Sequence, residues 1–168
     1  MMFLYMDKKF FDTKMMEEAL KEAQKAYGMD EVPVGAVLTR SGRILSRAHN
    51  QMEGLKDPSA HAELLCIREG ARILGDWRLL ETTLYTTLEP CLMCAGALLL
   101  SRVGRIVYGA PDLRHGAHGS YLNVFERKHP THTTQIEGGL LEAQSAELMR
   151  NFFKQQRKRN EAAAGSAL

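Results

Sequence analysis

The sequence predicts an α/β fold of three layers, in which a mixed five-stranded sheet is flanked by helices. Two observations lead to this prediction. Runs rich in β-branched and aromatic residues alternate with helical patterns along the chain, and strands joined through helices imply partly parallel pairing. The chain has 168 residues, 45% of them hydrophobic, which is enough for one core. We therefore expect a single domain over residues 7–160, followed by a disordered tail over 161–168 with the sequence "EAAAGSAL".

The first half of the chain predicts a helix, a hairpin and a second helix. Apolar residues recur at helical spacing over residues 12–27, with Asp12 as a candidate cap and Gly28 as the stop. The segment "VPVGAVLTRSGRILSRAHN", residues 32–50, has two β-rich runs on either side of Ser41-Gly42 and predicts a hairpin. A helical stripe over residues 59–74 follows a short loop, and Ser59 is its candidate cap.

The second half predicts three strands and two more helices. We expect strands over 82–90 and 105–110, with a helix over 91–103 between them. A glycine-rich loop, "PDLRHGAHGS", covers residues 111–120, and a weak strand is expected over 133–138. A last helix is predicted from about Leu140 to Arg159.

Composition excludes several classes of protein. The formal net charge is only +2, so a nucleic-acid partner has to be argued from local clusters of charge. The three cysteines are too few for a disulfide framework and favour a metal or redox role in a reducing compartment. The first nine residues, "MMFLYMDKK", are too short for the core of a signal peptide, and no apolar run reaches membrane-spanning length. We therefore expect a cytoplasmic protein with no membrane contact.

Two of the predicted helices begin with potential metal ligands. Cys91 and Cys94 are three residues apart and share one helix face, directly after Pro90, which suits a helix start. The positive end of the helix dipole favours thiolates there, and thiolates favour zinc. His61 stands where the earlier helix begins. One imidazole and two thiolates would leave a tetrahedral zinc with a fourth, open position, which is typical of a catalytic site.

Glu63 follows His61 by two residues, so its side chain diverges from the ligand direction on a helix. It is badly placed to chelate the same metal and better placed to meet a water molecule. We predict that it transfers protons, a role that contributes about 100- to 10,000-fold in rate.

Other interpretations of these residues stay open at the level of pattern. A lone C-x-x-C also fits thioredoxin-like redox chemistry or a structural zinc site. His115-x-x-His118 or His129-x-x-His132 could complete a closed site of four ligands, although Cys94 and His115 are farther apart than in the usual zinc finger. Cys66 lies on the apolar stripe of its helix and is interpreted as an inert core residue.

"HAE" at residues 61–63 and "PCLMC" at 90–94, with a strand between them, resemble the signature of zinc-dependent nucleobase deaminases. Further blocks resemble the bacterial tRNA-specific adenosine deaminase family in the same order. They are "EVPVGAV" at 31–37, "DPSAHAE" at 57–63, "TLYTTLEPCLMCAGA" at 83–97, "SRVGRIVYGAPD" at 101–112 and "GAHGS" at 116–120. The resemblance covers nearly the whole chain.

This resemblance implies a cytidine-deaminase-like fold, a homodimer, and hydrolysis of the wobble adenosine of an arginine tRNA to inosine with release of ammonia. It implies one Zn²⁺ per subunit. Carried over by position, the zinc ligands are His61, Cys91 and Cys94; the proton-transferring acid is Glu63; Asn50 reads the flipped base; the backbone around Ala62 and Pro90 lines the pocket; and Asp112 lies near the ribose. From pattern alone, Asn50 could instead cap a loop and Asp112 could be an ordinary turn residue.

The expected RNA partner is the tRNA anticodon stem-loop, whose bases are already partly unstacked. The segment "RNFFKQQRKR", residues 150–159, has five basic residues, no acidic ones and two phenylalanines. Phe153 and Arg157 are our candidates there for stacking and phosphate contact, and Arg114 and His115 in the glycine-rich loop are two more. A solvated helix face explains the same charges. The family usually has a paired basic motif after the phenylalanines, whereas this chain has Lys-Gln-Gln-Arg, which puts any single arginine contact in doubt.

Two competing functions remain at this stage. The zinc motifs alone also fit deamination of a free base or nucleotide such as guanine or cytosine. The non-enzymatic alternative is an RNA-binding module with structural zinc, or a catalytically silent partner subunit. Glu63 argues against a silent site, because a purely structural zinc site has no use for an acid beside it.

Overall fold

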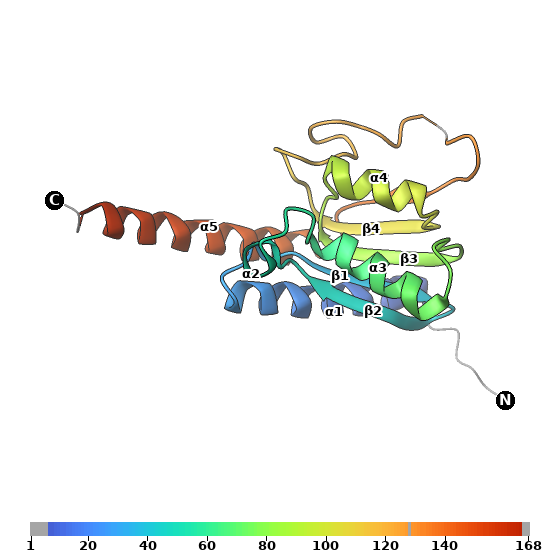
Figure 1. Ribbon diagram of the computed structural model, residues 1–168, viewed down its shortest axis with the longest axis horizontal. Helices are drawn as coiled ribbons and strands as arrows, with labels where there is room; N and C mark the ends of the chain where they lie inside the picture. The colour runs from blue at the N-terminus through green and yellow to red at the C-terminus, as the bar shows by residue number, and fades with distance from the viewer. Residues whose placement is uncertain (1–6, 128, 166–168) are drawn as a thin grey trace.

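The computed structural model describes residues 7–127 and 129–165, and Figure 1 shows its arrangement. The amino-terminal segment considered above as a signal peptide lies largely outside the described residues, as do residues 166–168 of the expected tail. The elements in chain order are α1 (Lys8–Gly28), β1 (Gly35–Arg40), β2 (Arg43–His49), α2 (Met52–Leu55), α3 (Ala62–Leu74), β3 (Thr82–Leu88), α4 (Leu92–Leu100), β4 (Arg105–Ala110), β5 (Gln135–Glu137) and α5 (Glu142–Gly165).

The five strands form one mixed sheet in the order β2-β1-β3-β4-β5. β1 pairs antiparallel with β2 and with β3, whereas β3–β4 and β4–β5 are parallel pairs. The parallel pair β3–β4 is joined through α4, as a crossover connection requires. The predicted fold class, a mixed five-stranded sheet with flanking helices, is confirmed.

The two faces of the sheet support two separate apolar layers, because neighbouring strand residues point to opposite faces. Leu38, Leu84 and Ile106 pack in one cluster with residues of α3 and α4. Their neighbours along the strands, including Val37 and Tyr85, pack in a second cluster with α1 residues. In Figure 1, α3 and α4 accordingly cover one face, and α1 lies across the other.

Two glycine positions explain local features of this framework. Ser41 and Gly42 both have positive φ, 50° and 74°, and form the two-residue turn of the predicted hairpin. At Gly35, a Cβ atom would lie 2.1 Å from the Ala19 carbonyl oxygen of α1. Only glycine therefore lets the first helix approach the sheet this closely.

Two expected helix caps and one expected loop differ from the structure. The cap of α1 is Asp7, whose carboxylate accepts the Lys9 amide, whereas Asp12 lies inside the helix and is buried. Ser59 does not cap α3: its amide and hydroxyl bond to Asp57, and His61 takes the cap position. A short helix, α2, lies in the segment that we expected to be a loop.

The last helix extends beyond its predicted end. α5 runs to Gly165, so residues 161–165, expected in the disordered tail, are helical in the structure. The run of alanines at 162–164 favours helix, and no proline or glycine interrupts it before Gly165. The far half of α5 projects beyond the body of the molecule, past α2 (Figure 1). Among the described residues, no helix is long and apolar enough to cross a membrane.

Candidate metal centre

The three predicted metal ligands come together where two helices begin. His61 and Cys91 occupy the cap positions of α3 and α4, both with extended backbone, and neither uses its side chain to cap the helix. Cys94 lies in the first turn of α4 and is fully buried, whereas His61 and Cys91 are partly exposed. The carboxyl end of β3 leads directly to Cys91, so the sheet sets the position of this pair.

The spacing of the ligand atoms fits zinc. The Nδ1 atom of His61 lies 3.6 Å from Sγ of Cys91 and 3.5 Å from Sγ of Cys94. Zinc bonds of about 2.0 Å to nitrogen and 2.3 Å to sulfur, at a tetrahedral angle, place nitrogen and sulfur about 3.5 Å apart. The donor set and its geometry therefore match a zinc ion held by three protein ligands.

The two cysteines differ in how readily they lose a proton. The hydrogen bond from the Cys94 thiol, together with contact to His61, lowers the pKa of Cys91 to about 4. The same shared proton raises the pKa of Cys94, and the bond to Cys91 raises the pKa of His61. A cation bound between these groups would replace the shared proton, because metal binding releases protons from its ligands.

Glu63 lies beside this centre in the first turn of α3 and is only 3% exposed. Burial raises the pKa of its carboxyl to about 7. The charges of Cys91 and His61 act on this carboxyl, and it raises the pKa of the Cys94 thiol in turn, so it lies close enough to the ligands to influence their protonation. A buried carboxyl that titrates near neutrality next to a metal site is suited to general acid–base catalysis.

The closed site of four ligands is not formed. Within the described ranges, His61, Cys91 and Cys94 are the one group of three or more metal-type side chains close enough to hold an ion. The ring of His118 instead bonds to the Tyr108 hydroxyl at 3.1 Å. His129 and His132 stack on each other at 4.3 Å between ring centres.

The two cysteines of the C-x-x-C segment cluster with His61, as a metal site requires. All three cysteines are free in the structure. Cys66 is fully buried, and burial raises the pKa of its thiol to about 12, as expected of an inert core cysteine.

Asn50 is buried directly after β2, beside the loop that leads to His61. The backbone of the next residue, Gln51, bonds to the Ala60 carbonyl, which brings this strand end next to His61. The Asn50 amide nitrogen donates to Glu31 at 3.1 Å, and Glu31 also accepts the amides of Glu53 and Gly54. A carboxylate only accepts, so the Asn50 oxygen is left as an acceptor for another group.

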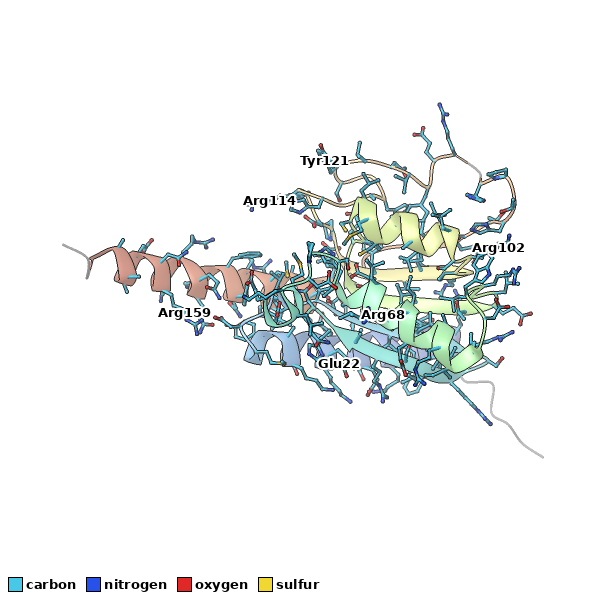
Figure 2. All side chains as sticks on the ribbon, in the orientation of Figure 1. Glu22, Arg68, Arg102, Arg114, Tyr121 and Arg159 are labelled. Carbon is cyan, nitrogen blue, oxygen red and sulfur yellow. The ribbon has the colours of Figure 1, made fainter. Side chains whose placement is uncertain are left out.

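The glycine-rich loop lies against α4 at the same end of the sheet. Ala62 and Pro90 are buried next to the ligands, and the Pro90 carbonyl accepts the Ala117 amide. Asp112 caps a turn by accepting the amides of Arg114 and His115 at 3.0 and 3.2 Å. The side chains of Arg114 and His115 are exposed, and Figure 2 shows Arg114 on this loop near the start of α4.

α5 places its candidate residues farther from the metal ligands. Phe152 is buried and stacks edge-on with Tyr27, whereas Phe153 is 40% exposed and Arg157 is exposed. Three polar residues of α5 attach it to the end of α1 and the turn that follows: Gln155 accepts from the Tyr27 hydroxyl, and Gln156 and Arg159 donate to Asp30. The described contacts do not bring Phe153 or Arg157 to the ligands.

Two buried acids near the site were not among the predicted residues. Glu31 holds Asn50, and Glu89, next to Pro90, accepts hydrogen bonds from the glycine-rich loop. Although burial opposes ionisation, bonds from Ser120 and the loop amides hold the pKa of Glu89 below its usual value. An acidic residue at the end of an apolar strand is the one signal that could have identified Glu89, because such residues are seldom buried without partners.

Comparison with known proteins gives concordant results. The sequence profile of the cytidine and deoxycytidylate deaminase zinc-binding region matches residues 10–110. The chain is 45% identical over 152 residues to the tRNA-specific adenosine deaminase of Bacillus subtilis, covering 90% of this chain and 94% of that protein. It is 46% identical over 164 residues to the chloroplastic tRNA(adenine(34)) deaminase of Arabidopsis thaliana, of which it spans only 12%.

A solved structure from a study of A-to-I editing by tRNA:A34 deaminases superposes with a TM-score of 0.77 at 44% identity. The match covers 81% of this chain and 99% of that one. The likeness therefore extends over the sheet and its helices as well as the short metal-binding motifs.

Proposed function

The chain belongs to the cytidine and deoxycytidylate deaminase zinc-binding family, and from this premise we propose that it is a tRNA adenosine deaminase that converts the wobble adenosine to inosine. The observation that carries the proposal is the buried Glu63 carboxyl beside the His61–Cys91–Cys94 ligand set. A purely structural site would not need this acid. The similarity to tRNA deaminases over 90% of the chain favours tRNA over a free base.

The reaction adds water to carbon 6 of adenine and releases ammonia, so it needs a group that twice accepts a proton from the water oxygen and passes it on, first to the ring and then to the amine. Glu63 can do both near neutral pH, because its carboxyl titrates at about 7. It would take a proton from the attacking water and give it to the ring nitrogen. It would then take the remaining proton from the new hydroxyl at carbon 6 and give it to the amine, which leaves as ammonia while the carbonyl of inosine forms. Zinc in this ligand set would supply an open coordination position and acidify water.

The target base must leave its stack to reach this centre, and we assign its recognition to Asn50. Glu31 accepts a hydrogen bond from the Asn50 amide nitrogen, so the Asn50 oxygen is left as an acceptor beside the loop that leads to His61. The backbone around Ala62 and Pro90 would line the same pocket, and Asp112 would lie near the ribose. These are the roles that the family resemblance implies.

The rest of the anticodon stem-loop would contact exposed basic groups. Arg114 and His115 lie on the loop beside α4, and Phe153 and Arg157 are exposed on α5. Where the family has paired basic residues, this chain has Gln155 and Gln156. Their side chains bond to Tyr27 and Asp30, at and just after the end of α1. We therefore assign the phosphate contacts on α5 to Arg157 and its exposed basic neighbours Lys154 and Lys158.

The choice of substrate can be tested directly. Zinc-quantified protein is incubated with an arginine tRNA anticodon stem-loop that carries adenosine at the wobble position, and in parallel with free adenosine, cytidine and guanine. We expect inosine and an equal amount of ammonia from the RNA alone. Ammonia from a free base or nucleoside alone would retain the deaminase chemistry but refute the tRNA assignment.

Subunit number and location stay predictions. We propose one zinc per subunit, a homodimer and a cytoplasmic protein, in keeping with the tRNA substrate. Light scattering after size-exclusion chromatography, combined with metal analysis, measures the first two. A monomer, or a metal content far from one zinc per chain, would contradict them.

A further inference from the structure

Glu89 is a buried carboxylate with an unusual set of partners. It is 1% exposed and lies between the last residue of β3 and Pro90. It accepts the backbone amides of Asp112, His118 and Ser120 at 3.1, 2.8 and 3.3 Å, as well as the Ser120 hydroxyl. In the part of the chain that the structure describes, no lysine or arginine forms an ion pair with it, so its partners are all groups of one loop.

That loop, residues 112–120, closes around the carboxylate. At Gly116, a Cβ atom would lie 2.4 Å from the Glu89 carboxyl carbon, so only glycine allows this approach. The backbone of Gly116 pairs with that of Cys91, and the Ala117 amide donates to the Pro90 carbonyl. The loop is thus held to Pro90 and to the ligand Cys91, just before α4 begins.

The loop also carries exposed groups that Glu89 does not touch. Arg114 and His115 stand on the turn capped by Asp112, and the Asp112 amide itself binds Glu89. The position of these two side chains therefore depends on one buried acid. Figure 2 shows Arg114 on this loop, near the start of α4 where the ligands lie.

We propose that Glu89 is a positioning residue: it anchors the loop 112–120 beside the metal centre and thereby sets the affinity for the RNA substrate rather than the rate of the chemical step. The role in affinity rests on the proposed function. The anchoring of the loop does not, because it follows from hydrogen bonds that are independent of any substrate.

The test compares Glu89→Gln with Glu22→Gln in the zinc-loaded protein. Both changes keep the side-chain shape at a buried position, but Glu22 lies on α1 and bonds to Lys25 and His49 instead of the loop. The rate of amide hydrogen exchange in peptides that cover residues 111–122 measures how firmly the loop is anchored, and it needs no substrate. We expect exchange about ten-fold faster in Glu89→Gln and unchanged in Glu22→Gln.

Steady-state kinetics with the anticodon stem-loop test the second part of the proposal, the role of Glu89 in substrate affinity. Glu89→Gln should raise KM about ten-fold, as expected from losing a bond to a charged group, while kcat stays within about two-fold and zinc is retained. Unchanged loop exchange would overturn the anchoring. Loss of zinc, or a fall in kcat with KM unchanged, would overturn the positioning role, because Glu89 would then act through the metal centre.

Ser120→Ala gives a milder version should Glu89→Gln fold poorly. It removes only the hydroxyl that donates to Glu89 and should speed loop exchange and raise KM in the same direction by a smaller factor. In the double variant the two effects should not add, because both changes remove the same bond. Fully additive effects would contradict the shared mechanism. If the wild type makes no inosine, the proposed function fails, while the exchange data still decide the anchoring.

Discussion

Two buried carboxylates on opposite faces of the sheet have opposite electrostatic settings. Asp12 of α1 accepts the Tyr85 hydroxyl at 2.6 Å and two bonds from the Arg105 guanidinium at 2.8 and 2.6 Å. Although burial opposes it, Arg105 holds the pKa of Asp12 below its usual value. Among the described residues, no arginine forms an ion pair with Glu63 of α3, and burial raises the pKa of its carboxyl to about 7.

The difference separates stability from chemistry. A buried charge with an arginine partner stays ionised and ties distant parts of the chain together; Asp12 and Arg105 are 93 residues apart. A buried acid without such a partner costs stability but can exchange protons near neutral pH. The two buried carboxyls therefore have opposite pKa shifts: Asp12, paired with Arg105, stays ionised, whereas Glu63 can exchange protons near neutral pH.

The largest expected effect comes from Glu63→Gln. The amide cannot accept or return a proton, so kcat on the anticodon stem-loop should fall by about 100- to 10,000-fold. Thermal stability should stay the same or rise, because an unfavourable buried acid is removed. Initial rates and a melting curve at matched zinc content provide the measurements. A variant that keeps most of its activity would exclude Glu63 as the proton-transfer group.

Asp12→Asn should have the opposite effect: it should lower stability and leave activity unchanged. It leaves the Arg105 guanidinium, whose side chain is 13% exposed, without its main partner, and the free energy of unfolding should fall by about 3 kcal/mol. Activity per folded molecule should be unchanged. Urea unfolding measures the first quantity, and active-site-normalised rates measure the second. A stable variant with reduced kcat would mean that the two faces are not separated as described.

As the pH rises, the ionisation of these two carboxyls should change the stability of the fold in opposite directions. The pKa of Asp12 is lowered by folding, so its contribution is present above pH 3.8 and is lost as pH falls below that value. The pKa of Glu63 is raised from 4.5 to about 7, so its ionisation costs stability as pH rises through this range. Melting curves of the metal-free protein from pH 3 to 8 should lose the second trend in Glu63→Gln. If that variant keeps the trend, another group is responsible.

Tyr85→Phe is the smallest of these changes. It removes one hydrogen bond to Asp12 but leaves the Arg105 bonds, so the loss should be about 1.5 kcal/mol. Combined with Asp12→Asn, the loss should be less than additive, because the two residues share this bond. A double-mutant cycle in urea measures the coupling, and a coupling of zero would show that the bond contributes nothing to stability.

The shared face of Cys91 and Cys94, and the divergence of Glu63 from His61, could be predicted because these relations are local, whereas His61 reaches Cys91 from 30 residues away. Two cysteines three residues apart on a helix share a face, and an acid two residues after the histidine does not. The partly parallel pairing of the sheet was also predicted, since crossovers through helices imply parallel pairs.

What the sequence did not reveal depends on distant partners. Asp12 was predicted to be a cap, because nothing local indicates that Arg105 will bind it. Glu89 gave no local sign that amides 23 to 31 residues later would surround it. The same holds for Glu31, whose bond to Asn50 joins two segments on either side of the hairpin.

The central claim is that the His61–Cys91–Cys94 centre, with Glu63, edits the wobble adenosine of tRNA. The most direct measurement is to map inosine by sequencing a full-length arginine tRNA after incubation with the zinc-loaded protein, where inosine is read as guanosine. The account predicts conversion at the wobble adenosine alone, and none with Glu63→Gln. Conversion at other adenosines, or equal conversion by Glu63→Gln, would contradict it.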